Sequence, residues 1–146
     1  MDTHVTTKMK ISKPAHEVFE AFVNPEKMAN FWFSSGTGRM EPGKTIIWRY
    51  DEYNAEGSVL VLEVEENKKI VFSWGAENQE TIVTITLKEL DFTSTIVEVN
   101  ESGLKADDPE IVNKMLQQKE GWVYMLTCLK GYLENGVSNL RASLVH

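Results

Sequence analysis

The feature that most constrains the fold is a change of hydrophobic period along the chain. Over residues 38–103, apolar residues recur at every second position and turn residues separate the runs, which predicts an antiparallel meander of about six strands. The period then becomes that of one long helix, with Asp108 as its N-cap, Pro109 as its first residue and Asn135-Gly136 as its stop. A helix of about 27 residues is roughly 40 Å long and can cross a whole sheet.

Three shorter elements precede the meander. Residues 5–11 alternate apolar and polar side chains, which is typical of a half-buried strand. Pro14 to Phe22 has the spacing of a short amphipathic helix. Asn24 and Pro25 supply the cap and first residue of a second helix, which is expected to end after Trp32. The element order predicts an α+β fold.

The chain is long enough to build one sizeable core without a metal ion or a disulfide. No linker, repeat or low-complexity stretch divides it, so we expect one domain over residues 1–146, with its core at about 5–135. A curved antiparallel sheet that grips the C-terminal helix is the simplest packing of these elements. One helix does not fill the concave side of such a sheet, so a pocket between helix and strands is expected.

Large side chains point toward this predicted interior. Trp48, Trp74 and Trp122 fall on inward faces, whereas Trp32 is expected near one mouth of the grip, and Lys119 interrupts the apolar helix face where an entrance could lie. Aromatic residues could fill a core or wall a pocket, and the pattern leaves both open. The residues predicted to line the cavity are Trp32, Trp48, Tyr50, Phe72, Trp74, Val83, Ile85, Val97, Val99, Met115, Lys119, Trp122, Met125 and Leu126.

Composition excludes several classes of function. With 15 Lys and Arg against 22 Asp and Glu, the net charge of −7 argues against a general nucleic-acid binder, which needs a basic face. The single cysteine, Cys128, cannot form an internal disulfide, which favours a reducing compartment. No apolar run approaches the roughly 18 residues of a membrane span, and residues 1–10 lack the apolar run of a signal peptide. We expect a cytoplasmic protein.

No recognisable catalytic motif is present. The sequence lacks a nucleophile triad, a metal-ligand cluster, a phosphate-binding loop and a dinucleotide fingerprint, so no catalytic residue, metal or cofactor is assigned. Glu63 and Glu101 continue apolar strand faces and could point inward, as could Arg49, although strand ends usually reach solvent. Surface positions are expected for His4, His16 and His146, and a buried, inert thiol for Cys128.

Several short motifs in this order resemble the START-like (SRPBCC, helix-grip) superfamily, and within it the stand-alone bacterial homologues of the heat-shock protein 90 ATPase activator's C-terminal domain. The resemblance covers about residues 5–135. Two places depart from it: residues 41–44, where many relatives double the glycine, and residues 65–67, where a proline is usual. Its markers are the Pro14 to Phe22 helix, Trp32 after Asn24-Pro25, Pro42-Gly43, Gly57, Val71-Phe72-Ser73-Trp74, Gly121-Trp122, Leu126, Leu129 and Tyr132-Leu133.

The resemblance implies a helix-grip fold but leaves the class of function open. Some relatives hold lipids, sterols, polyketides or phenolics, others act on polyketide-like substrates, and the eukaryotic activator is a cochaperone. The leading hypothesis is a small binding protein, a monomer or weak dimer, that holds an apolar or amphipathic molecule in the cavity. A chaperone-linked interaction domain is the second. The third is a cyclase, dehydratase or hydrolase whose acid–base groups come from Glu63, Glu101, Tyr50 or Arg49.

Overall fold

Seven antiparallel strands form one sheet in the computed structural model, which describes residues 3–145. Their order is β1-β7-β6-β5-β4-β3-β2, so consecutive strands pair from β2 to β7 and β1 returns beside β7. This arrangement confirms the predicted meander and the α+β class. The strands are β1 (Val5–Ile11), β2 (Ser35–Gly36), β3 (Thr45–Tyr50), β4 (Ala55–Glu65), β5 (Lys69–Trp74), β6 (Thr81–Asp91) and β7 (Ser94–Ser102).

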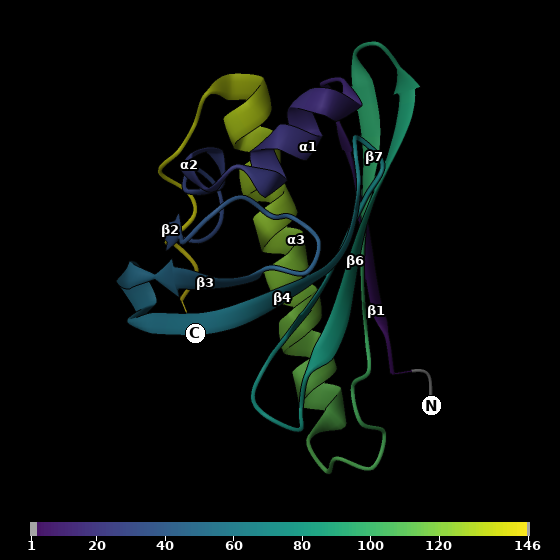
Figure 1. Cartoon of the computed structure of the whole chain (residues 1–146), viewed down its shortest axis with the longest axis vertical. Coiled ribbons are helices and arrows are strands. Elements are labelled where there is room, and N and C mark those ends of the chain that lie inside the picture. Colours follow the sequence, from purple (N-terminus) through teal and green to yellow (C-terminus); the bar gives the residue numbers. More distant parts are fainter. Residues whose placement is uncertain (1–2, 146) are drawn as a thin grey trace.

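The sheet curves around one long helix, α3 (Ile111–Asn135). Strands β3 and β4 swing to one side of α3, while β6, β7 and β1 lie on the other (Figure 1). Two short helices, α1 (Ala15–Val23) and α2 (Pro25–Met28), cover the end of the grip where α3 finishes, and a 3₁₀ turn, η1 (Asp51–Tyr53), links β3 to β4. This is the predicted helix grip.

The core lies between the concave face of the sheet and the second half of α3. Met125, Leu126 and Leu129 are at most 3% exposed, whereas Val112 and Leu116 in the first half are 54% and 63% exposed. The helix closes the grip from Trp122 onward, whereas its first half, although Ile111 at its start is buried, leaves space between itself and β4. The sheet contributes the period-two set Ile46, Trp48, Val59, Val61, Ile70, Phe72, Val83, Ile85, Val97 and Val99, all buried.

The second short helix is shorter than predicted. Asn24 caps it, as expected, by accepting a hydrogen bond from the Glu26 backbone N–H at 3.0 Å. The helix ends at Met28 and not after Trp32, because the Asn30 side chain donates to two carbonyls of its last turn and satisfies them. The chain then turns inward, and β2 forms where the helix stop was predicted.

The long helix begins two residues later than predicted. Asp108 caps a turn and not the helix: its carboxylate accepts from the Glu110 backbone N–H at 2.8 Å, and its carbonyl accepts from the Ile111 N–H at 3.1 Å. The same carboxylate forms an ion pair with Lys114 in the first full turn of α3. The predicted stop at Asn135-Gly136 is confirmed, because Gly136 adopts φ of +66°, a left-handed conformation suited to glycine.

Candidate ligand-binding site

Aromatic rings from both halves of the grip meet in one cluster. Trp32 lies at its centre, with ring centroids 4.9 Å from Trp48, 6.1 Å from Trp74 and 5.6 Å from Trp122. The predicted place of Trp32 at one mouth of the grip is wrong, since the early end of α2 turns this side chain inward and leaves it only 7% exposed. We call Trp32, Phe33, Trp48, Phe72, Trp74 and Trp122 the aromatic cluster.

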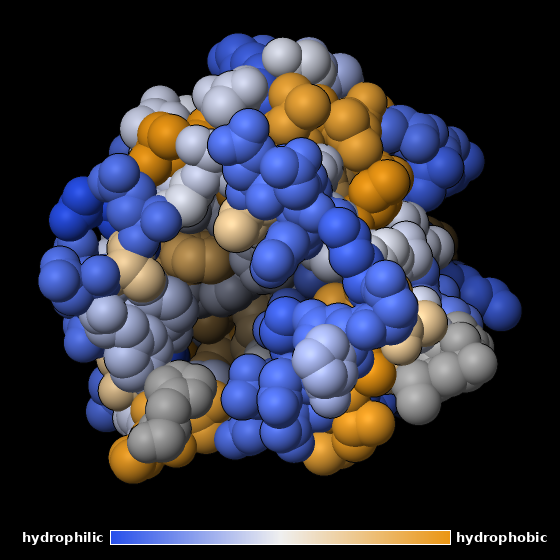
Figure 2. Space-filling model, turned by 90° about the horizontal axis from the view of Figure 1, so that it is seen from below, coloured by the Kyte–Doolittle hydropathy of each residue, from blue (hydrophilic) through white to orange (hydrophobic). Residues whose placement is uncertain are grey.

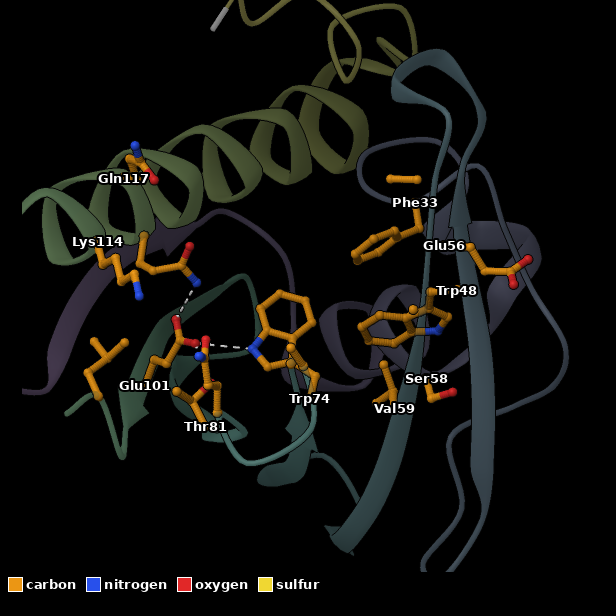
Figure 3. A pocket seen from close by; sticks show the side chains of 17 residues that line it. Phe33, Trp48, Glu56, Ser58, Val59, Trp74, Thr81, Glu101, Lys114 and Gln117 are labelled. Atoms are coloured by element: carbon orange, nitrogen blue, oxygen red, sulfur yellow. Dashed lines mark hydrogen bonds between the residues drawn. The ribbon is translucent and has the colours of Figure 1, made fainter. Parts of the chain in front are cut away.

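A pocket of about 580 Å³ opens beside the aromatic cluster, between β4 and the first half of α3. Phe33 and Trp74 form its floor above the buried Trp48, and Lys114 and Gln117 of α3 also line it, with Lys114 directed inward (Figure 3). Figure 2 shows a hollow at this end of the molecule, with hydrophobic residues inside it and hydrophilic residues around its rim. This main pocket is in the size range of small-molecule sites.

A buried carboxylate, Glu101 of β7, lies at the inner end of the main pocket and is only 1% exposed. Its Oε1 accepts hydrogen bonds from Gln118 Nε2 at 2.8 Å and Trp122 Nε1 at 2.9 Å. Its Oε2 accepts from Trp74 Nε1 at 3.1 Å and Thr81 Oγ1 at 2.5 Å (Figure 3). Indole N–H groups only donate, so each oxygen is held as an acceptor, which suits an ionised carboxylate.

No basic side chain among residues 3–145 forms an ion pair with Glu101. The other two charged residues that line the main pocket are already paired: Lys114 with Asp108, and Glu56 with Arg49 at 2.6 Å. Burial of a charge without an opposite charge is costly, and here neutral donors alone compensate it. The main pocket therefore presents one negative charge that no side chain of the described chain offsets.

A second, smaller pocket of about 240 Å³ adjoins the first and shares Trp74 and Gln118 with it. Its wall includes Tyr50 of β3, Met125 of α3 and Leu144 from the segment after α3. This segment, residues 137–145, is the C-terminal strap. Gln118 and Trp74 thus separate the main pocket from a pocket that the C-terminal strap helps to line.

One arginine fastens the C-terminal strap. Arg141 Nε donates to the Trp32 carbonyl at 2.7 Å, and its guanidinium binds both carboxylate oxygens of Glu52, at 2.6 and 3.0 Å. The same group lies 4.7 Å from the centroid of the Tyr50 ring. The hydroxyls of Tyr50 and Tyr124 donate to strap carbonyls, and burial raises the pKa of Tyr50.

The residues predicted to line the cavity divide into four groups. Trp48 and Trp74 line the main pocket, and Trp74 also lines the second pocket. Met115 and Lys119 line neither pocket, and the Lys119 ammonium donates to the Thr6 carbonyl of β1. The remaining second-pocket residues are Trp32, Tyr50, Trp122 and Met125, while Phe72, Val83, Ile85, Val97, Val99 and Leu126 are fully enclosed in the core.

Two of the suggested acid–base groups lie outside both pockets. A β-bulge between Val61 and Glu63 shifts the register of β4, so Glu63 points outward and pairs with Lys69 at 3.0 Å. Arg49 is on the outer face of β3 and pairs with Asp51 and Glu56. The hypothesis that either side chain points into the cavity is wrong. Glu101, from the same hypothesis, lies in the main pocket.

The other candidate reactive groups are the histidines and Cys128. His4 and His16 are exposed, as predicted, whereas His146 lies outside the described residues. Cys128 is buried, and this burial raises the pKa of its thiol. Within residues 3–145 no group of three or more His, Cys, Asp or Glu side chains could hold a metal ion. The described helices include none that is both long and apolar enough to cross a membrane.

A curved seven-stranded sheet wrapped around one C-terminal helix, with a pocket between them, defines a helix-grip domain of the START-like class. Residues 12–134 match the family described as "Activator of Hsp90 ATPase homolog 1-like protein". The chain belongs to this family, which confirms the resemblance drawn from the sequence motifs. No protein of curated function matches the sequence.

Solved structures give the same assignment of fold. A protein from Staphylococcus saprophyticus is 47% identical, with a TM-score of 0.81, over 92% of this chain and 94% of that one. DynU16, from the dynemicin biosynthetic locus, is 24% identical with a TM-score of 0.83, over 97% of this chain and 50% of its own. The Aha1 dimer from Colwellia psychrerythraea is 18% identical with a TM-score of 0.78, over 91% of this chain and 97% of that one. The last two likenesses show the fold alone.

Proposed function

We propose that this protein binds an amphipathic small molecule in the main pocket. The observation that carries the proposal is the pair of part-exposed rings, Phe33 and Trp74, in a pocket of about 580 Å³ between β4 and the first half of α3. A floor of flat rings with one buried polar group is the usual composition of a small-molecule site. The place of DynU16 in a biosynthetic locus for a natural product agrees with this class of ligand.

The floor can supply most of the binding free energy. A ligand that buries about 250 Å² of apolar surface gains roughly 6 kcal/mol at 25 cal/mol per Å², before it loses its translational and rotational freedom. Because 6 kcal/mol corresponds to a Kd of about 40 μM before that loss, we expect affinities in the high micromolar to millimolar range for simple probes. Specificity would come from the few polar groups at the inner end, chiefly Glu101.

Binding is better supported than catalysis by the polar groups of the main pocket. Both oxygens of Glu101 are held by neutral donors, and the two other charged lining residues, Lys114 and Glu56, are engaged in ion pairs. An acid–base mechanism needs a group that can exchange its proton with the substrate at hydrogen-bond distance. This arrangement suits a group that orients a ligand.

Gly57 of β4 offers a direct way to fill the main pocket. It lines the pocket opposite Trp48 in the β3–β4 register, and a Cβ added there meets no atom within 4 Å. We expect Gly57→Leu to weaken binding of the neutral fluorescent probe N-phenyl-1-naphthylamine at least tenfold. The fold should persist, because leucine suits a strand better than glycine does.

Gly38 provides the matched control. A Cβ at Gly38 also meets nothing within 4 Å, but this residue lines none of the described pockets. Gly38→Leu should therefore bind the probe like the wild type. Titration of probe fluorescence and of tryptophan emission measures the three proteins. Saturable binding that is equal in all three, or none in the wild type, would overturn the proposal.

A further inference from the structure

The four donors to Glu101 differ in how firmly they are held. Trp74, Thr81 and Trp122 are fixed by β5, by β6 and by the closed half of α3, and Trp122 is only 3% exposed. Gln118 lies on the first half of α3, is part-exposed, and borders both pockets. Its amide is therefore the one donor that can leave Glu101 Oε1 without moving the core.

The surroundings of Glu101 favour a positive group. Its buried charge has no ion pair within the described chain, whereas the other charges of the main pocket are offset by their own partners. A cation that reached Oε1 would add the attraction of opposite charges to the hydrogen bond that it replaces. It would also remove the cost of an uncompensated buried carboxylate.

The aromatic floor favours the same kind of ligand. The part-exposed rings of Phe33 and Trp74 lie 6.2 Å apart between centroids, with an interplanar angle of 79°. Rings set at such different inclinations surround a ligand from more than one side. A cation held within about 6 Å of a tryptophan ring face is attracted by its π electrons. Apolar burial and a positive charge can thus be satisfied together.

We infer that the ligand of the main pocket is an amphipathic amine, whose ammonium group replaces the Gln118 amide on Glu101 Oε1 and whose apolar body lies on Phe33 and Trp74. The inference rests on the proposed function, since it names the class of ligand for the same pocket. Before the ligand binds, the Gln118 amide occupies the position on Glu101 Oε1 that the ammonium group would take.

Three probes with one skeleton test the charge directly: 4-phenylbutylamine, 4-phenylbutanol and 4-phenylbutanoate, measured by calorimetry at pH 7. We expect the amine to bind at least tenfold more tightly than the alcohol, and the carboxylate to bind most weakly. The preference for the amine should persist from 0.15 to 0.5 M salt, because a buried pair is screened far less than a surface charge. If the preference for the amine vanishes at 0.5 M salt, it comes from the net charge of −7 and not from Glu101, and the inference is overturned.

Two neighbouring glutamines supply a matched pair of variants. Gln118→Ala removes the internal donor, so amine affinity should rise about threefold to tenfold while alcohol affinity changes less. Gln117 lines the same pocket but does not bond to Glu101, so Gln117→Ala should leave both affinities unchanged. A purely structural role of Gln118 would instead lower the affinity of all three probes or leave it unchanged.

Glu101→Gln should abolish the preference for the amine. This variant also changes the group that accepts hydrogen bonds from two indoles, and it can unfold the protein. The comparison of Gln118→Ala with Gln117→Ala is the test that does not depend on Glu101→Gln. Equal affinities for amine and alcohol, or tighter binding of the carboxylate, overturn the inference and leave the proposed function standing. Failure of all three probes beside saturable binding of N-phenyl-1-naphthylamine also overturns the inference alone, whereas failure of every probe overturns both.

Discussion

Each end of the aromatic cluster carries one carboxylate, and the two are compensated in opposite ways. Glu52, whose side chain is 43% exposed, forms a bidentate ion pair with Arg141 of the C-terminal strap. Glu101, only 1% exposed, receives four hydrogen bonds from neutral groups and no ion pair. The more exposed carboxylate thus has the cation, and the buried one has none.

The difference separates a structural charge from one available to a ligand. At Glu52 the chain supplies its own cation, and the strap that bears it lines the second pocket and closes that end of the grip. At Glu101 the compensating cation is missing from the described chain and the adjoining pocket is open. The comparison predicts that changes at the strap alter stability most, and changes around Glu101 alter binding most.

The largest expected effect is that of Arg141→Ala. This change removes the bonds to Glu52 and to the Trp32 carbonyl, and leaves that buried acceptor without its donor. Breaking a buried pair costs about 3–5 kcal/mol, and the partial exposure of Glu52 lowers our expectation to about 2–3 kcal/mol in the free energy of unfolding. Urea denaturation followed by tryptophan fluorescence measures it.

Arg49 is the matched control for Arg141. It also forms ion pairs with two carboxylates, but its side chain is 50% exposed. Arg49→Ala should cost far less unfolding free energy than Arg141→Ala, because solvent screens exposed pairs. Losses of equal size in the two variants would contradict the distinction between strap and surface.

The fold was largely predictable because it depends on patterns that a sequence displays directly. The period-two faces of the strands and the stop at Gly136 were correct. The errors fell at local boundaries: the Asn30 side chain ended α2 early, and Asp108 capped a turn in place of the helix. Such outcomes depend on side-chain hydrogen bonds between near neighbours, which period and propensity do not specify.

The site was less predictable, because it depends on how far α3 stands from the sheet. The sequence placed Glu101 on the same face as Val97 and Val99 and left open whether it points inward; the structure brings Trp122 and Gln118 against it. The direction of Glu63 was also left open, and the β4 bulge turns it outward. A single inserted residue in a strand carries no signal in the alternation itself.

The two indoles that donate to Glu101 offer a smaller and sharper comparison. Trp122→Phe and Trp74→Phe each keep an aromatic ring and remove one N–H. We expect a loss of about 2 kcal/mol for Trp122, which is 3% exposed, and of about 1 kcal/mol for the half-buried Trp74, where water can replace the donor. Urea denaturation of both variants measures this order, and the reverse order would show that water does not reach Trp74 from the pocket.

The smallest expected effect is the response of the strap to acid. The hydrogen bonds from Arg141 lower the pKa of Glu52 from 4.5 to about 2. A lowered carboxyl pKa adds stability that is fully present above pH 4.5 and is lost as pH falls toward 2.

Because the Glu52 side chain is 43% exposed, screening should limit this contribution to about 1 kcal/mol or less. Between pH 6 and pH 2.5 the wild type should therefore lose up to that much more unfolding free energy than Glu52→Gln, which keeps the shape of the group and lacks its charge. Parallel pH profiles for the two proteins would mean that Arg141 holds the strap through the Trp32 carbonyl alone.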